Sequence, residues 1–346
     1  MSRAPRLDSA GMWEVTCAWP EQLPGAFEAG RSLASSARVA DPPVRAVLAI
    51  GVGTGGAACD AAAALTAGQL AVPFVVCHDS EVPAFVGPDC LVVAVACGDM
   101  PETLAAARLS EARGARMVGI GSDPALARLL EASGSPWCAV GAAGGATRRA
   151  AFGPATVSLL GVLSAAELLP DCAAEVGAAA EFVARRRDAF VADRGNASEL
   201  ARRIGRTIPL VYGSSGCTAV AARWWKSCVN LNAKSPAFTA ALPGLTYDEL
   251  AGWGQGGDIT RQTMSMVFLR GHGEPPHVPA LFESVRSATE EVMADIIDVW
   301  ADSPDDLGRL FELALLGDLV SLELAAREGV DPGPVPAVDE ARTAQR

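Results

Sequence analysis

The chain has 346 residues, half of them hydrophobic and only 5% aromatic, and its formal net charge is −12. This length is enough for two cores of roughly 150 residues each, and the abundance of alanine and glycine favours helices packed on parallel sheets over an aromatic-rich β-sandwich. The negative charge disfavours a general electrostatic hold on nucleic acid or on an anionic membrane, so an anionic ligand must be held locally by backbone N–H groups and one or two arginines.

The cysteines, histidines and apolar runs bear on compartment and metal binding. The nine cysteines lie without a Cys-x-x-Cys pair or a metal-like spacing to histidine, which is typical of reduced, mostly buried thiols in a cytosolic protein. The three histidines, His78, His272 and His277, are too scattered to suggest a metal site. No apolar run of signal-peptide length stands at the N-terminus, and the longest apolar stretch, residues 150–169, is interrupted by Glu167. We therefore expect a cytoplasmic protein without a membrane segment.

The first half of the chain alternates between strand and helix patterns. Residues 44–50 predict a strand, residues 51–56 a glycine turn and residues 57–67 a helix. Further strands are expected at residues 72–77, 90–97 and 116–120, with a helix at residues 101–113. Another helix begins near Ser122-Asp123-Pro124, where a serine or aspartate can cap it and proline suits its first turn. This alternation, which continues to about residue 140, predicts a doubly wound unit.

The second half repeats this order of strand, turn and helix after a helical stretch at residues 150–191. A strand at residues 208–212 leads into the turn Gly213-Ser-Ser-Gly216 and a helix. Downstream we expect a strand at residues 266–269, helices at residues 278–299 and 307–329, and an extended proline-rich segment at residues 330–336. The predicted parts are an N-terminal helical segment (1–30), a first α/β domain (31–150), a helical connection (151–195), a second α/β domain (196–336) and a C-terminal tail (337–346).

Two small-residue turns are candidate ligand sites. The first satisfies Gly-x-Gly-x-x-Gly from Gly51 to Gly56, between a strand and a helix, and Asp79 is the candidate ribose acid of a dinucleotide site. A turn that packs against its own helix and a cradle for a phosphate or a sugar remain alternatives. In the second turn Ser214 and Ser215 either cap a helix or bind a phosphate or a sugar hydroxyl.

A third stretch is unusual in composition. Asn230, Asn232 and Lys234 crowd a helix end before Pro236, where asparagine lowers helix propensity unless it serves a turn or a site. A solvated helix terminus is the alternative.

The order of these motifs resembles the phosphoglucose/phosphomannose isomerase branch of the sugar-isomerase (SIS) family over nearly the whole chain. The resemblance rests on both turns and on Gly98-Asp-Met-Pro-Glu-Thr103, Thr147-Arg-Arg149, Trp225-Lys226, Asn230-Leu-Asn-Ala-Lys234, Trp253 and Asp331-Pro332. It implies two SIS domains, each a doubly wound parallel sheet flanked by helices. It also implies a homodimer with its active site between domains and subunits, and a reaction that needs neither metal nor nucleotide cofactor.

Several positions depart from the family's binding pattern. The family has glycine-glycine-serine in the first turn, whereas Gly53 is followed here by Thr54 and Gly55. The family's phosphate loop carries three hydroxyl residues, whose places are taken here by Val95, Cys97 and Met100, and Asp99 adds a negative charge. Such a loop should bind a phosphate dianion poorly, because like charge and lost hydrogen bonds act in the same direction.

The positions that carry catalysis depart as well. Leu231 stands where the family has its glutamate base, and Tyr247 where it has the ring-opening histidine. Arg342 aligns with the family's C-terminal lysine, and the active-site arginine is kept as Arg149. Leucine cannot move a proton between C1 and C2 of a sugar, so Asp248 or Glu249 would have to act as a replacement carboxylate.

The leading hypothesis is a protein that binds a sugar or a sugar phosphate and whose ordinary isomerase activity is lost or altered. The expected substrate-binding residues are Gly53, Thr54, Gly55, Cys97, Gly98, Thr103, Ser214, Ser215 and Asn232. Three alternatives stay open: an active isomerase with an unusual substrate, a non-catalytic sugar sensor or partner subunit, and an NAD(P)-binding enzyme that uses the turn from Gly51 to Gly56.

Overall fold

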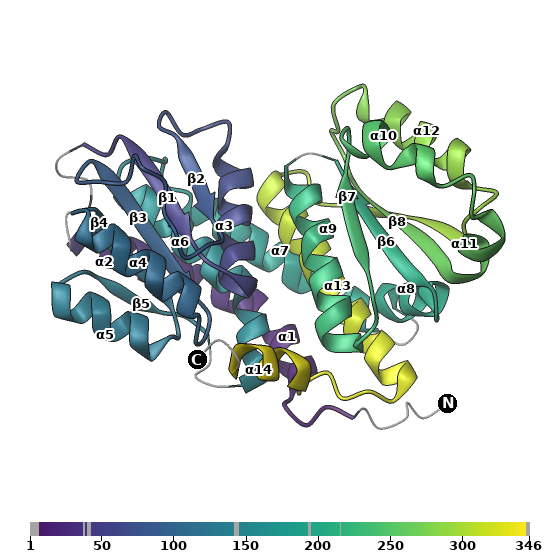
Figure 1. The fold of residues 1–346 in the computed structure, drawn as a ribbon, viewed down its shortest axis with the longest axis horizontal. Coiled ribbons are helices and arrows are strands. Elements are labelled where there is room, and N and C mark those ends of the chain that lie inside the picture. The colour runs from purple at the N-terminus through teal and green to yellow at the C-terminus, as the bar shows by residue number, and fades with distance from the viewer. Residues whose placement is uncertain are drawn as a thin grey trace. The chain divides into compact units, whose positions relative to one another are not determined.

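A computed structural model of the chain describes residues 7–36, 39, 43–141, 145–192, 195–214 and 216–343, without the side chains of residues 35, 36, 145–147 and 343. The chain divides into two compact units. We call residues 18–181 the N-terminal unit, and residues 182–346 together with residues 1–17 the C-terminal unit. Each unit is built on its own parallel sheet flanked by helices (Figure 1).

The N-terminal unit contains a five-stranded parallel sheet in the order β2-β1-β3-β4-β5. Its strands are β1 (Ala46–Ile50), β2 (Phe74–Cys77), β3 (Cys90–Ala96), β4 (Arg116–Gly121) and β5 (Trp137–Ala139). Its helical segments are η1 (Pro20–Gln22), α2 (Leu23–Ser36), α3 (Gly53–Thr66), α4 (Pro101–Ala112), α5 (Pro124–Ser133), η2 (Gly145–Ala151) and α6 (Phe152–Ala165); α7 (Ala173–Val191) continues into the other unit. The central strand β3 is buried over its whole length, as expected for a strand covered on both faces.

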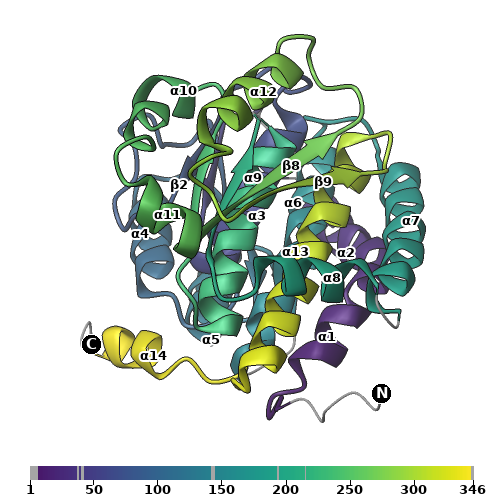
Figure 2. The ribbon, with the colours of Figure 1, turned by 90° about the vertical axis from the view of Figure 1, so that its right-hand side faces the viewer.

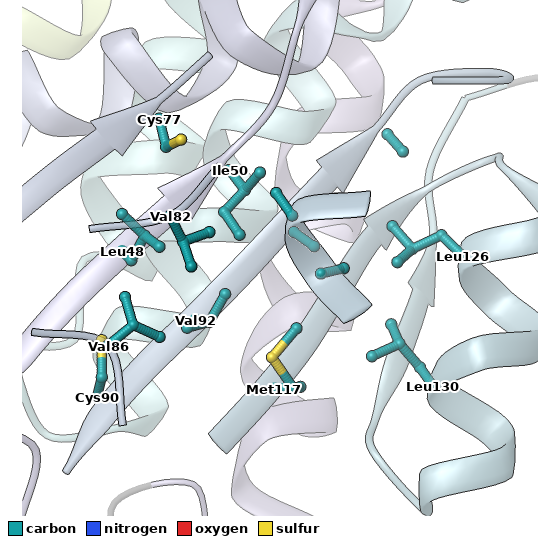
Figure 3. Close-up of a cluster of buried hydrophobic side chains, with 14 of the residues drawn as sticks. Leu48, Ile50, Cys77, Val82, Val86, Cys90, Val92, Met117, Leu126 and Leu130 are labelled. Atoms are coloured by element: carbon teal, nitrogen blue, oxygen red, sulfur yellow. The ribbon is translucent and has the colours of Figure 1, made fainter. Parts of the chain in front are cut away.

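One core of this unit lies between the sheet and helices α4 and α5. Leu48, Val92 and Met117 come from three neighbouring strands, and Leu126 and Leu130 of α5 pack against them (Figure 3). Helices α2 and α6 pack together on the opposite face. Successive strand residues point to opposite faces of the sheet, and helices cover both faces. These strands therefore read as continuous apolar runs.

The C-terminal unit contains a four-stranded parallel sheet in the order β7-β6-β8-β9. Its strands are β6 (Ile208–Gly213), β7 (Phe238–Ala241), β8 (Met264–Gly271) and β9 (Asp295–Ala301). Its helices are α1 (Met12–Ala18), α8 (Asn196–Ile204), α9 (Cys217–Cys228), α10 (Leu245–Asp248), α11 (Gly257–Thr263), α12 (Val278–Thr289), α13 (Asp306–Glu328) and α14 (Pro336–Thr343), with a π-helical turn at Val229–Ala233 and the short 3-10 turn η4 (Leu250–Gly252). Figure 2 shows α10, α11 and α12 in front of this sheet, whereas α13 packs with α8 and α9 on its other side.

The predicted α/β class with two parallel sheets is confirmed, and most predicted elements are present. Asp123 caps α5 by accepting a hydrogen bond from the amide of Ala125 (2.8 Å), as the Ser-Asp-Pro signal indicated. The long apolar pattern after residue 306 is the helix α13. Among the described residues, no helix combines the length and the apolar character needed to cross a membrane.

One element prediction is wrong. The helix expected at residues 278–299 ends at Thr289, and residues 295–301 form the edge strand β9 beside β8. Its side chains alternate between buried and exposed from Ile297 onward, the two-residue period of a strand. The local helical pattern is outweighed by pairing with β8 and by the strand preference of the β-branched residues Ile296, Ile297 and Val299. The four-residue strand β7 was not predicted.

Candidate functional site

In parallel α/β sheets ligands bind where the carboxyl ends of the strands meet the following helices, and most of the predicted site residues lie there. In the N-terminal unit the turn after β1 is adjacent to the loop after β3: a Cβ placed on Gly53 would lie 3.9 Å from Cε of Met100. Gly53 has a φ of +57° and is exposed, and Thr54 is half-buried. These two residues are the accessible part of the first turn.

The other glycines of this turn are required by packing. A Cβ on Gly55 would lie 2.2 Å from the carbonyl oxygen of Val95, and one on Gly56 would lie 2.6 Å from the carbonyl oxygen of Gly51. His78 fixes the turn from the neighbouring strand, with Nδ1 2.9 Å from the Gly51 carbonyl oxygen. Tight packing of the turn on its own helix and sheet thus accounts for the glycine spacing without a dinucleotide.

At the end of β3 and in the residues that follow it, most of the predicted binding positions are buried. Val95 and Cys97 are buried, and burial raises the pKa of the Cys97 thiol to about 12. The amide of Met100, at the start of α4, donates a hydrogen bond to Oδ2 of Asp123 (3.3 Å). The hydroxyl oxygen of Thr103 is buried and makes no hydrogen bond. The buried Cys97 thiol is therefore neutral, and the Met100 amide already faces a carboxylate.

The arginine that lies on this loop is Arg148, which the sequence analysis did not single out. Gly98 has a φ of +119°, and a Cβ there would lie 2.3 Å from Cδ of Arg148. Only glycine permits this approach. Arg149, the predicted active-site arginine, is half-buried and follows it in η2. The Arg-Arg pair in the sequence was the available signal for Arg148.

In the C-terminal unit Ser214 is engaged in local hydrogen bonds. Its amide donates to Oγ1 of Thr218 (3.0 Å), and the two hydroxyl oxygens lie 2.9 Å apart. Ser214 is only 6% exposed and does not cap α9, whose N-cap position is Gly216 without a side-chain cap hydrogen bond. Ser215 lies outside the described residues.

The asparagine-rich stretch is an irregular turn rather than an ordinary helix end. Residues Val229–Ala233 form a π-helix, a rare conformation that is frequent at functional sites. Asn232 is 2% exposed and its Nδ2 donates to Oγ of Ser321 (2.8 Å). The side-chain oxygens of Asn230 and Asn232 are both buried without a hydrogen-bond partner. Leu231, half-buried, lies between these two unsatisfied acceptors.

The remaining predicted catalytic positions follow β7 or belong to the C-terminal helix. Tyr247 is 87% exposed and Asp248 is also exposed, whereas Glu249 accepts a hydrogen bond from the Tyr212 hydroxyl. Burial, and then Glu249, raise the pKa of Tyr212 far above its ordinary value, so the phenol stays protonated. Arg342 lies on α14. Of the two candidate replacement carboxylates, Glu249 is therefore the one held in place.

A buried charge pair at the end of β8 was missed by the sequence analysis. Arg270 and Glu274 are each 8% exposed and form a bidentate pair, with Nε 2.8 Å from Oε1. The guanidinium lies between the rings of Phe282 (4.2 Å) and Trp300 (4.5 Å). The local signal for this pair was an arginine four residues before a glutamate.

Comparisons with known proteins agree with this architecture. Residues 193–344 match the family described as bacterial phospho-glucose isomerase C-terminal SIS domain. A bifunctional phosphoglucose/phosphomannose isomerase of Caldicellulosiruptor bescii is 26% identical over 333 residues, which are 95% of this chain and 97% of that protein. The protein of the same name from Aquifex aeolicus is 32% identical over 143 residues, 41% of this chain and 43% of that protein.

Among solved structures, the C-terminal domain of glucosamine-fructose-6-phosphate aminotransferase from Francisella tularensis is similar with a TM-score of 0.72. The match covers 93% of this chain and 97% of that one at 15% identity, and this likeness concerns the fold. Residues 193–344 therefore match a C-terminal SIS domain, and nearly the whole chain is similar to a bifunctional phosphoglucose/phosphomannose isomerase at 26% identity.

Proposed function

We propose that this protein binds a sugar or a sugar phosphate at its strand ends and does not catalyse the ordinary isomerisation of glucose 6-phosphate or mannose 6-phosphate. The observation that carries the proposal is Leu231, which stands in the middle of the π-helix between Asn230 and Asn232. The isomerisation that gives the relatives their name moves a proton between C1 and C2 through a cis-enediol. A leucine side chain can neither accept nor donate that proton.

The other substitutions act in the same direction. The loss of a general base alone lowers a rate by about 10²–10⁴-fold. Here the thiol of Cys97 is buried and neutral, and Tyr247 points largely into solvent at 87% exposure. Neither group offers a substitute proton carrier. Two unsatisfied buried oxygens, those of Asn230 and Asn232, remain as acceptors suited to sugar hydroxyl groups.

A second candidate function is isomerisation of an unusual substrate by Glu249. The specific observation in its favour is the hydrogen bond that the Tyr212 hydroxyl donates to Glu249, because it holds one of the two candidate carboxylates in a fixed position. The first proposal includes a non-catalytic sensor or partner subunit. Such a protein binds the sugar without converting it, and the ligand acts only through binding.

Proton transfer is the reaction step that separates these functions. Glucose 6-phosphate, mannose 6-phosphate and fructose 6-phosphate are incubated with the protein in deuterated water, and deuterium at C2 of the aldoses is followed by NMR. We expect no incorporation above that of an Arg149→Ala control. Incorporation that disappears in Glu249→Gln would overturn the first proposal and assign the proton transfer to Glu249.

The role of position 231 is tested by adding the missing carboxylate. Incorporation of deuterium by Leu231→Glu but not by Leu231→Gln would attribute the lost proton transfer to this position. Binding is measured separately as a ligand-dependent rise in the melting temperature, which follows mass action. If none of the three sugar phosphates nor the free sugars raises it, the sugar-binding function itself is wrong.

The wider setting belongs to the same proposal. We also propose a homodimer, from the family resemblance, and a cytoplasmic location, from that resemblance and from the nine cysteines, none of which forms a disulfide. The net charge of −12 argues against nucleic acid as a partner. No cofactor is required for enediol chemistry. We also propose domain boundaries at residues 30, 150, 195 and 336.

A further inference from the structure

Three segments of the N-terminal unit meet at the loop after β3. The first turn approaches this loop through Gly53, where an added Cβ would lie 3.9 Å from Cε of Met100. The segment η2 approaches the same loop through Arg148, which packs on Gly98. All three segments belong to residues 18–181, so one unit brings together the sugar-binding turn, the loop and an arginine.

The guanidinium of Arg148 lies directly on the backbone of the loop. A Cβ on Gly98 would lie 2.3 Å from Cδ, 2.5 Å from Nη1 and 3.1 Å from Nε of Arg148. The arginine therefore fills the space in which any other residue at position 98 would place its side chain. Arg148 is half-buried, so its positive charge is held against the loop and part of the side chain still faces solvent.

The acidic groups near the loop do not cancel this charge. Asp123 is 2% exposed, and its two oxygens accept hydrogen bonds from the amides of Met100 (3.3 Å) and Ala125 (2.8 Å). Its position as the N-cap of α5 also offsets its negative charge. Asp99 is exposed on the loop. Against it stand the cations of Arg148 and of the next residue in the chain, Arg149.

The start of α4 adds a polar group that lacks a partner. Thr103 lies in the first turn of this twelve-residue helix and is fully buried, and its hydroxyl oxygen makes no hydrogen bond. Buried hydroxyl groups in folded proteins are nearly always paired. An oxygen of a bound ligand would provide the missing partner, and the N-terminus of a helix favours an oxygen that carries negative charge.

We propose that Arg148 binds the phosphate group of a sugar phosphate at this loop and so makes the site prefer the phosphorylated sugar to the free sugar. Guanidinium groups form paired, charge-assisted hydrogen bonds with phosphate. These bonds replace the hydroxyl donors whose absence at Val95, Cys97 and Met100 led the sequence to predict weak phosphate binding. The inference rests on the proposed function, because it concerns the same strand-end site.

The test measures the affinities of the full-length protein for glucose 6-phosphate and for glucose by isothermal titration calorimetry. We expect the wild type to bind glucose 6-phosphate at least about tenfold more tightly than glucose. Arg148→Gln should lower the affinity for glucose 6-phosphate by about 10- to 100-fold, the range for hydrogen bonds to charged groups. Its affinity for glucose should stay unchanged. Arg148→Lys keeps the charge without the paired geometry and should lie between the two.

Arg45→Gln is the matched control. Arg45 is 83% exposed and precedes β1, at the opposite end of this strand from the first turn, so its loss should alter neither affinity. The melting temperature of Arg148→Gln without ligand should equal that of the wild type, which shows that the variant is folded.

The ratio of the two affinities separates selection from a structural role. Equal losses for both ligands in Arg148→Gln, or the same loss in Arg45→Gln, would overturn the inference. If the wild type binds glucose as tightly as glucose 6-phosphate, this inference is wrong and the proposed sugar-binding function stands. If it binds neither ligand, both are wrong.

Discussion

Cys97 illustrates at the scale of one residue how burial sets chemistry in the loop after β3. Burial raises its pKa to about 12, whereas an exposed thiol has a pKa near 8.5. Between these values the unfolded chain releases this proton and the folded chain keeps it. The folded state therefore binds more protons, and its stability must fall as the pH rises.

We predict that the contribution of Cys97 to stability is complete below about pH 8.5 and is lost progressively toward pH 12, at about 1.4 kcal/mol per pH unit. Urea unfolding of the wild type and of Cys97→Ala at pH 8 and pH 10.5 measures this. The wild type should lose more stability over this interval than the variant does. Equal losses would mean that the thiol is accessible to water.

Glu312 is a single buried carboxylate on which several donors converge. It is 1% exposed and accepts hydrogen bonds from Arg186 (2.6 Å) and from the amides of Asp302 (2.8 Å) and Ser303 (3.0 Å). Burial nonetheless raises its pKa. Its negative charge is paired with Arg186, and both of its oxygens accept hydrogen bonds.

We predict that Glu312→Gln lowers the free energy of unfolding by about 3–5 kcal/mol, because an amide offers one acceptor to three donors and leaves Arg186 without its buried partner. Chemical denaturation measures the loss. Glu199→Gln is the matched control, since its pair with Arg202 is exposed to solvent and should contribute little to stability. A loss no larger than that of the control would show that the pair contributes little.

At the scale of elements, the crossing of α2 and α6 depends on two glycines. A Cβ on Gly30 would lie 2.1 Å from the carbonyl oxygen of Ser158, and one on Gly161 would lie 2.2 Å from that of Phe27. Oγ of Ser158 also donates to the carbonyl oxygen of Ala26 (2.8 Å). The helix backbones therefore touch, and neither glycine has room for a methyl group.

Gly161→Ala should destabilise the protein by about 1–3 kcal/mol through overpacking, although alanine is the better helix former. Gly25→Ala, on α2 with no atom within 4 Å of the added Cβ, should instead leave stability unchanged or raise it by up to about 1 kcal/mol. Thermal or urea unfolding of the two variants checks the contrast. Similar values for both would show that the helices can separate at no cost.

At the scale of the whole molecule, charge and assembly are the testable properties. With a pI near 4.8 the protein should pass through a heparin column at low salt, because it has no excess of cations to replace counterions. Light scattering should give twice the 35.5 kDa of one chain if the proposed homodimer forms. A monomer at micromolar concentration would contradict the homodimer, and retention on heparin would contradict the exclusion of polyanions.

The site was predicted from sequence only in part. The glycine turn, the loop after β3, the Gly-Ser-Ser-Gly turn and the asparagine stretch could be proposed from sequence, because each follows a strand or ends a helix and carries a local composition signal. Arg148 on Gly98, the Tyr212–Glu249 hydrogen bond and the Arg270–Glu274 pair were not. Each of these contacts depends on which segments of the chain the fold brings within a few ångströms of one another.

By itself, the sequence determined the α/β class, the repeated order of strand, turn and helix, and the cap of α5 at Asp123. Hydrophobic periodicity, turn residues and capping residues act over a few residues, so a local pattern records them. The tertiary structure alone decided the strand orders β2-β1-β3-β4-β5 and β7-β6-β8-β9. It also decided that residues 295–301 are a strand. The reason is that strand pairing and the pairing of buried charges are energies of contact between distant segments, which no local pattern records.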